Sequence, residues 1–352
     1  YTIGKIEVIL LMEDKKTFKW AEYIFIFAFM VLIVSFSFTF MPFSLFLITL
    51  IPLPILIATY RHNTLPGVVI ATLASIFFAY FLQDSTLVIL VIAMATVGVG
   101  IGNAMKEGLS SKKVLIIGIV SSLITMFLLG LGLSLVTKQP LSEFYKETTD
   151  RIIEDITKIE TTNEANIERV RLAINTFTLL LPSMLITGAV LIAGINFMAG
   201  SSILRKMGVP NVQALPPISN WTFPTWLSIT YFILWPLSLI GTFPPVVSII
   251  IKNLHSIVRW FLVLQGLGVL IYFLNTVRVP NWLKVIILLP VYLFSSWFLG
   301  FIGALDPWLK YRGRVRLYKE ELEKEKEKEF DKEIEKEGRT GNIHAQRIEL
   351  PE

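Results

Sequence analysis

Long apolar runs recur along this chain, and their length constrains the fold more than any other feature. A helix that crosses the hydrocarbon core of a bilayer needs about 20 mostly apolar residues. Nine such runs lie at residues 24–40, 43–60, 66–82, 86–105, 114–136, 173–200, 225–241, 257–277 and 283–303. The sequence therefore predicts an all-α, polytopic integral membrane protein with about eight to nine transmembrane helices.

The distribution of charge supports this interpretation. Only 17% of the residues are charged, and 12 of the 32 Lys/Arg and 13 of the 27 Asp/Glu lie from residue 305 onward. The net charge of +5 does not indicate a nucleic acid partner, because the other basic residues stand mostly at the ends of apolar runs, as the positive-inside rule requires. We expect the lipid bilayer of a cell membrane to be the main surroundings of this multi-pass chain.

Basic residues also orient the first six runs. They precede the first run and follow the second, fourth and sixth, whereas the turns at 41–42 and 83–85 have none. This places the N-terminus in the cytoplasm and residues 137–171 outside. Nine crossings would put the basic cluster Lys310–Arg316 outside. We therefore expect an extra crossing, a re-entrant segment or an external tail, with Pro244–Arg259 as the irregular stretch, and we favour a cytoplasmic tail.

Two segments are not typical of membrane spans. Apolar residues recur at helical spacing between acidic residues and threonines from Leu141 to Arg171, which predicts one amphipathic helix, or two with a break at Thr161–Asn163. A Lys/Glu run from Leu317 to Glu337 predicts a solvent-exposed helix.

The predicted organisation is a cytoplasmic segment (1–23), a five-helix bundle (24–136), an external amphipathic segment (137–171), C-terminal membrane helices (172–304, with a cytoplasmic loop at 201–223) and a charged, partly helical or disordered tail (305–352).

Polar residues inside apolar runs are the first candidates for a binding site, because each costs free energy in hydrocarbon. Gln265 lies in the middle of the eighth run and Asn196 in the sixth. Each side chain has two interpretations: it binds a ligand, or it forms a hydrogen bond to another helix. Tyr231 in the seventh run is a third candidate, either for ligand binding or as a packing or interfacial aromatic residue.

Glycines and prolines mark places where helices approach each other or bend. Gly98 and Gly102 form a small-xxx-small pair, and Gly266 and Gly268 follow Gln265, one on each side of Leu267. Such glycines favour close helix packing. The run Gly98–Asn103 is not a nucleotide-binding loop, because that fingerprint needs a strand–turn–helix unit. The prolines at positions 52, 54 and 182 predict broken or kinked helices.

Charged and aromatic residues at the ends of runs predict anchors at the membrane interface. Arg61 follows the second run, and Asp306, Trp308 and Arg312 follow the ninth. The simplest interpretation of all four is a position at the bilayer surface, where the basic cluster Lys310–Arg316 would attract anionic lipid head groups.

The residues that catalysis requires are scarce. The chain has no cysteine and only three histidines, far apart in sequence. No paired carboxylates and no metal-ligand spacing lie within the apolar runs. We therefore expect no enzyme activity, no catalytic residue, no metal and no cofactor.

Several short motifs follow one another in a distinctive order. They are Pro52-Leu53-Pro54, Gly98–Gly102, Leu204-Arg205-Lys206-Met207-Gly208, Leu215-Pro216-Pro217-Ile218 with Trp221, Phe223-Pro224-Thr225-Trp226, Gln265-Gly266, and Gly303–Trp308 before the basic Lys310–Arg316. In this order the chain resembles the YybS-like family of polytopic membrane proteins from low-GC Gram-positive bacteria, over roughly residues 20–316.

The resemblance implies a bacterial plasma membrane protein whose hydrophobic core is similar to the substrate-binding subunits of energy-coupling-factor vitamin transporters. In such a protein the first six spans enclose a small ligand, and partner ATPases with a coupling subunit drive its movement. The chain departs from those subunits in one respect. They carry an Ala-rich patch on the first helix, whereas Ala21 and Ala28 form no close-spaced pair.

Two functions stay open. We favour a transport-related, small-molecule-binding membrane subunit without its own ATPase, with ATPase and coupling subunits as partners. The alternative is a non-catalytic membrane scaffold or regulator of cell-envelope or signalling processes. In that case the segment 137–171 and the tail bind envelope proteins, and the apolar body anchors them.

Overall fold

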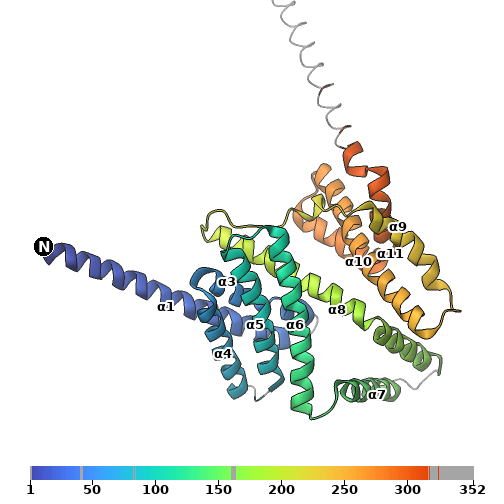
Figure 1. The fold of residues 1–352 in the computed structure, drawn as a ribbon, viewed down its shortest axis with the longest axis horizontal. Helices are drawn as coiled ribbons and strands as arrows, with labels where there is room; N and C mark the ends of the chain where they lie inside the picture. Colours follow the sequence, from blue (N-terminus) through green and yellow to red (C-terminus); the bar gives the residue numbers. More distant parts are fainter. Residues whose placement is uncertain are drawn as a thin grey trace, which may run out of the picture. The chain divides into compact units, whose positions relative to one another are not determined.

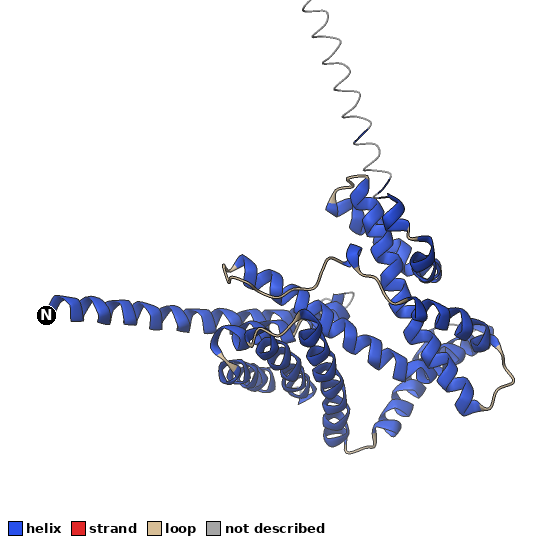
Figure 2. Cartoon of the chain, turned by 45° about the horizontal axis from the view of Figure 1, so that its top comes forward, coloured by secondary structure: helices blue, strands red, loops and turns tan. Residues whose placement is uncertain are grey.

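The fold is known from a computed structural model, which describes residues 2–39, 43–81, 83, 85–159, 164–315, 317 and 324. Every regular element within these residues is a helix, as Figures 1 and 2 show, so the predicted all-α class is confirmed. The elements are α1 (Thr2–Thr39), α2 (Ser44–Thr49), α3 (Pro52–His62), α4 (Thr64–Phe81), α5 (Ser85–Lys106), α6 (Ser111–Thr137), α7 (Leu141–Ile159), α8 (Glu164–Lys206), a 3-10 turn (Ile218–Asn220), α9 (Thr225–Leu239), α10 (Pro245–Thr276) and α11 (Asn281–Leu309).

The apolar runs correspond closely to these helices. Within the described residues, seven helices are long and apolar enough to cross a membrane: α1, α4, α5, α6, α8, α10 and α11. The second and seventh runs form shorter apolar segments, Phe46–His62 and Thr225–Leu239. The shortening of the second run has a visible cause, because its prolines divide it into α2 and α3.

Three predicted segments overlap the helices of the structure. The stretch Pro244–Arg259 is not a separate re-entrant segment, because α10 is one helix from Pro245 to Thr276. Pro245 occupies its first position, where the missing N–H costs nothing. The loop predicted at 201–223 begins only after Lys206, the last residue of α8. The predicted N-terminal segment 1–23 is, from Thr2, part of α1.

Three other predictions fall outside the described residues. They are the turn at Met41-Pro42, the break at Thr161–Asn163 and, apart from Leu317 and Lys324, the Lys/Glu helix of the tail. The amphipathic segment before that break is present as α7, and the residues after it from Glu164 belong to α8.

The chain divides into two compact units. Unit 1 comprises Tyr1–Leu215 and Phe243–Ile257, and unit 2 comprises Pro216–Thr242 and Val258–Glu352. The predicted segments 24–136, 137–171 and 172–304 were defined by hydropathy, whereas these two units are defined by contacts. The predicted segments therefore stay a prediction.

The core of unit 1 surrounds α3. All side chains from Pro52 to Thr59 are buried, and α3 contacts α1, α4, α5 and α8 (Figure 1). A Cβ atom on Gly98 would lie 2.6 Å from the Pro52 carbonyl oxygen, and one on Gly102 would lie 2.9 Å from that of Leu56. These two glycines therefore lie on the face of α5 that contacts α3, where their lack of side chains permits a close approach.

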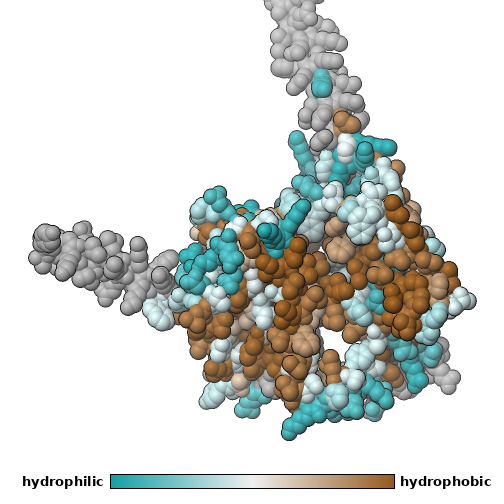
Figure 3. All heavy atoms as spheres, in the orientation of Figure 1, coloured by the Kyte–Doolittle hydropathy of each residue, from teal (hydrophilic) through white to brown (hydrophobic). Residues whose placement is uncertain are grey.

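The outer surface of unit 1 is apolar. On the face that Figure 3 shows, hydrophobic residues cover the middle of the helices and hydrophilic residues gather toward their ends. On α6, for example, Phe127 is 70% exposed. Lipid chains rather than water suit such a surface.

Unit 2 has a smaller core of its own. Leu227 and Tyr231 of α9 pack against Val258 and Leu262 of α10 and Ala304 of α11. The α11 helix carries Pro290 and has a kink at Ser295, where φ and ψ are −127° and 26°.

Candidate ligand-binding site

Two glycines bring α10 and α11 of unit 2 into close contact. A Cβ atom on Gly266 would overlap the carbonyl oxygen of Leu299, and one on Gly303 would overlap that of Leu262. Neither helix can carry a side chain at these positions without moving its neighbour. The crossing places Gln265, next to Gly266, beside Asp306, which lies one turn beyond Gly303.

The side-chain amide of Gln265 connects three segments at this crossing. Its Nε2 donates to Asp306 Oδ2 at 3.0 Å, and its Oε1 accepts from the backbone N–H of Phe223 at 3.0 Å. Gln265 is 1% exposed and Asp306 is 5% exposed. The amide therefore ties α11 and the segment before α9 to α10, and it satisfies two polar groups that burial would otherwise leave unpaired.

Arg312 closes the same cluster from beyond the end of α11. Its Nη1 donates to the Ser219 carbonyl at 2.8 Å, and its Nη2 donates to the Gln265 carbonyl at 3.3 Å and lies 3.4 Å from Asp306 Oδ2. A Cβ atom on Gly268 would lie 2.5 Å from the Ile218 carbonyl, so this glycine admits the 3-10 turn against α10. Burial lowers the pKa of the Arg312 guanidinium, while Asp306 and Tyr272 act in the opposite direction.

A cavity of about 310 Å³ opens next to this cluster, entirely within unit 2. Its lining combines charged, polar and apolar groups: Thr222, Phe223, Gln265, Asp306, Pro307, Lys310, Arg312 and Gly313. Its volume is at the lower end of the range for small-molecule sites, which is about 300–1,000 Å³. We call it the Gln265 cavity. Small-molecule sites commonly have such a lining, in which a few polar groups fix the orientation of the ligand.

The other two predicted ligand-binding residues lie elsewhere. Asn196 is fully buried in unit 1, where its Nδ2 donates to the carbonyls of Thr49 at 2.7 Å and Ile192 at 2.8 Å. Tyr231 is 1% exposed in the core of unit 2, with its ring parallel to that of Trp235 at 6.4 Å. Neither lines the Gln265 cavity, so the structure brings only Gln265 to it.

The predicted interface anchors also differ in their surroundings. Trp308 is 46% exposed, with its ring 5.7 Å from that of Phe232. Asp306 and Arg312 are mostly buried, and both contact Gln265 beside the Gln265 cavity. Arg61 forms an ion pair with Glu22, and His62 Nε2 lies 3.1 Å from Glu22 Oε2.

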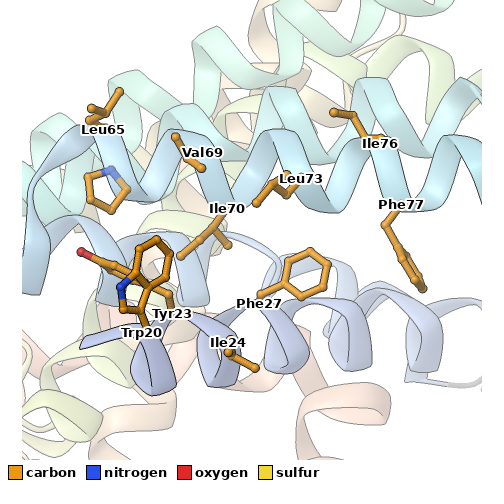
Figure 4. A pocket seen from close by; sticks show the side chains of 11 residues that line it. Trp20, Tyr23, Ile24, Phe27, Leu65, Val69, Ile70, Leu73, Ile76 and Phe77 are labelled. Carbon is orange, nitrogen blue, oxygen red and sulfur yellow. The ribbon is translucent and has the colours of Figure 1, made fainter. Parts of the chain in front are cut away.

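A second, larger hollow in unit 1 differs from the Gln265 cavity. It is a groove of about 570 Å³ along α1 and α4, shown in Figure 4. Nearly all its lining side chains are aliphatic or aromatic: Trp20, Tyr23, Ile24, Phe27, Leu65, Pro66, Val69, Ile70, Leu73, Ile76 and Phe77. With so few polar groups to fix an orientation, this groove suits lipid chains better than a polar molecule.

Sequence reasoning missed several residues that define the site. The Ser219 carbonyl and the Phe223 N–H are backbone groups, so side-chain chemistry gave no signal for them. Lys310 was recognisable only as one member of a basic cluster. Among the described residues, no group of three His, Asp or Glu side chains is placed to hold a metal ion.

The fold and the site define a polytopic α-helical membrane protein with a small cavity, lined by charged, polar and apolar residues, in its C-terminal unit. More particularly, the chain belongs to the DUF2232 family, described as predicted membrane proteins, which it matches over residues 26–307. No curated protein and no solved structure matches the chain.

Proposed function

We propose that this protein is a transport-related membrane subunit that binds a small molecule in the Gln265 cavity and has no ATPase of its own. The observation that carries the proposal is the meeting of Gln265, Asp306 and Arg312 beside a cavity of about 310 Å³. Buried charged and polar groups in a membrane protein are costly, and they commonly mark substrate pathways. The proposal assigns no catalytic residue.

The finer parts of the proposal rest on the sequence resemblance. They are the relation to YybS-like proteins, the likeness to energy-coupling-factor substrate-binding subunits, a location in the bacterial plasma membrane, and ATPase and coupling subunits as partners. On that likeness the ligand would lie among the first six spans. We place it instead in unit 2, because the lining of the groove in unit 1 is almost entirely apolar.

The alternative function, a membrane scaffold or regulator, has one observation in its favour. Helix α7 is strongly amphipathic. Such a helix suits a protein partner or a membrane surface. A scaffold, however, gives no role to the Gln265 cavity.

Native mass spectrometry of the protein, extracted gently from its own membranes, tests the proposal. We expect a retained small molecule, and we expect Gly313→Trp to lower its occupancy roughly tenfold by filling the cavity. At Gly313 the nearest neighbour of a Cβ would be Lys310 Cβ at 3.9 Å, so a side chain fits there. The matched control is Gly241→Trp, since nothing lies within 4 Å of a Cβ there. A folded protein without any retained molecule, or equal retention by both variants, would overturn the proposal.

A further inference from the structure

The charges around the Gln265 cavity do not balance. Two cationic side chains, Lys310 and Arg312, line it together with one carboxylate, Asp306. The lining thus carries a net charge of +1 when all three groups are ionised. A bound cation would add to this imbalance, whereas one negative charge would remove it.

Arg312 also has a hydrogen-bond donor to spare. Its two terminal nitrogens donate to the carbonyls of Ser219 and Gln265. Its Nε is buried and has no hydrogen-bond partner among the described residues. A buried donor without an acceptor is costly, so a shift of this side chain toward an acceptor of a ligand in the cavity would remove that cost.

The other polar groups of the lining suit the same kind of ligand. Lys310 has a left-handed backbone conformation (φ 47°, ψ 43°) directly after α11, at the wall of the cavity. Its ammonium group offers hydrogen-bond donors and no acceptor. Thr222, also in the lining, adds a hydroxyl group that can donate to an anion. The side chains of Gln265 and Asp306 are already hydrogen-bonded to each other.

We propose that the Gln265 cavity binds an oxyanion, the phosphate or carboxylate group of its ligand, through Lys310 and Arg312. This inference rests on the proposed function and names the ligand class of the same site. Charge-assisted hydrogen bonds from a guanidinium and an ammonium group are the strongest contacts that proteins make to such groups. The remaining, apolar part of the ligand would contact Phe223 and Pro307.

The oxyanion has two possible sources, a soluble metabolite or the head group of an anionic lipid. Titration calorimetry on the full chain in phosphatidylcholine nanodiscs, with inorganic phosphate and acetate as probes, tests the soluble source. Native mass spectrometry of lipid retained from phosphatidylglycerol nanodiscs tests the head group. We expect saturable binding in at least one arm, and either result supports an oxyanion site while identifying its source.

Lys310→Met supplies the decisive variant. Lys310 is exposed, so methionine removes the charge without leaving a buried gap. We expect roughly tenfold weaker binding of the probe that binds wild type. Arg314→Met is the matched control, because it removes one charge from a neighbouring exposed residue outside the cavity lining. We expect that variant to bind as wild type does.

The outcomes separate this inference from the proposed function. No anion binding in either arm, or equal losses in Lys310→Met and Arg314→Met, would overturn the oxyanion site. If a neutral molecule is nevertheless retained from native membranes and lost in Gly313→Trp, the proposed function stands without the oxyanion. If anions bind but no native ligand is retained, the oxyanion site stands and the transport role fails.

Discussion

Asn253 of α10 is hydrogen-bonded both to the Ser183 N–H and to the Leu179 carbonyl of α8. In an uninterrupted helix the Ser183 N–H would donate to the Leu179 carbonyl. Here, one residue after Pro182, it donates to Asn253 Oδ1 at 2.9 Å, while Asn253 Nδ2 donates to the Leu179 carbonyl at 2.8 Å. The side-chain amide of Asn253 thus joins α10 to α8 beside Pro182 and satisfies both the Ser183 N–H and the Leu179 carbonyl.

Asn196 donates a related hydrogen bond at the proline break between α2 and α3. The Leu53 N–H, which would otherwise donate to the Thr49 carbonyl, donates to Leu50 at 3.0 Å because of the turn between α2 and α3. Asn196 Nδ2 then donates to the free Thr49 carbonyl. At each of these two proline sites an asparagine from another helix therefore satisfies a backbone carbonyl, as a membrane interior requires.

The first prediction follows from the hydrogen bond that Asn196 donates. Asn196→Leu leaves the Thr49 carbonyl buried without its donor, which we expect to destabilise unit 1 by about 1–2 kcal/mol. Hydrogen–deuterium exchange of the α3 amides measures this as faster exchange. The control is Asn175→Leu, because Asn175 is exposed on the same helix. Equal exchange in the two variants would refute the role of Asn196.

The second prediction concerns the coupling between Asn253 and Pro182. Pro182→Ala restores an N–H and removes the clash of the ring, so the Ser183 N–H can return to Leu179. Asn253→Leu should then cost about 1–2 kcal/mol in the wild-type chain and clearly less in the Pro182→Ala chain. Unfolding in mixed SDS micelles, followed by circular dichroism for all four chains, measures this difference. Additive effects would contradict this coupling.

Much of the fold was predictable because membrane spans are defined by length and hydropathy. The apolar runs located nearly every helix, since a segment in hydrocarbon must satisfy its backbone internally. Pro52 and Pro54 predicted the break between α2 and α3, and Gly98 and Gly102 predicted a close helix contact. These signals are local in the sequence, so they can be interpreted without knowing which distant residues they contact.

The candidate site was only partly predictable because its contacts are distant in sequence. Gln265 stood out as a polar residue in an apolar run, but nothing in the sequence paired it with Asp306, 41 residues later. Asp306 and Arg312 resemble ordinary interface anchors until α10 and α11 are placed together. Asn253 was visible only as part of an irregular stretch, because the acceptor and donor that it binds are backbone groups.

The third prediction tests the glycine crossing of unit 2. Gly303→Ala places a methyl group against the Leu262 carbonyl, which we expect to cost about 1–3 kcal/mol and to separate α10 from α11. The matched control in the same unit is Gly313→Ala, where the nearest neighbour of the Cβ lies at an ordinary 3.9 Å. SDS titration of both variants measures the difference. A Gly303→Ala chain as stable as the control would show that the two helices are not this close.

The last prediction concerns Glu22, which faces both Arg61 and His62 in unit 1. The side chains of Glu22 and His62 are 9% exposed and that of Arg61 is 24% exposed, so solvent screens this group little. A double-mutant cycle with Glu22→Gln and Arg61→Met should give a coupling energy of about 1–3 kcal/mol. The ion pair of Glu147 and Arg151 on α7, 52% and 78% exposed, is the control. Its own cycle should give about 0.3–0.5 kcal/mol. If Arg61 is only an anchor at the bilayer surface, the two coupling energies will be equal, because an ion pair that is surrounded by water contributes little to stability.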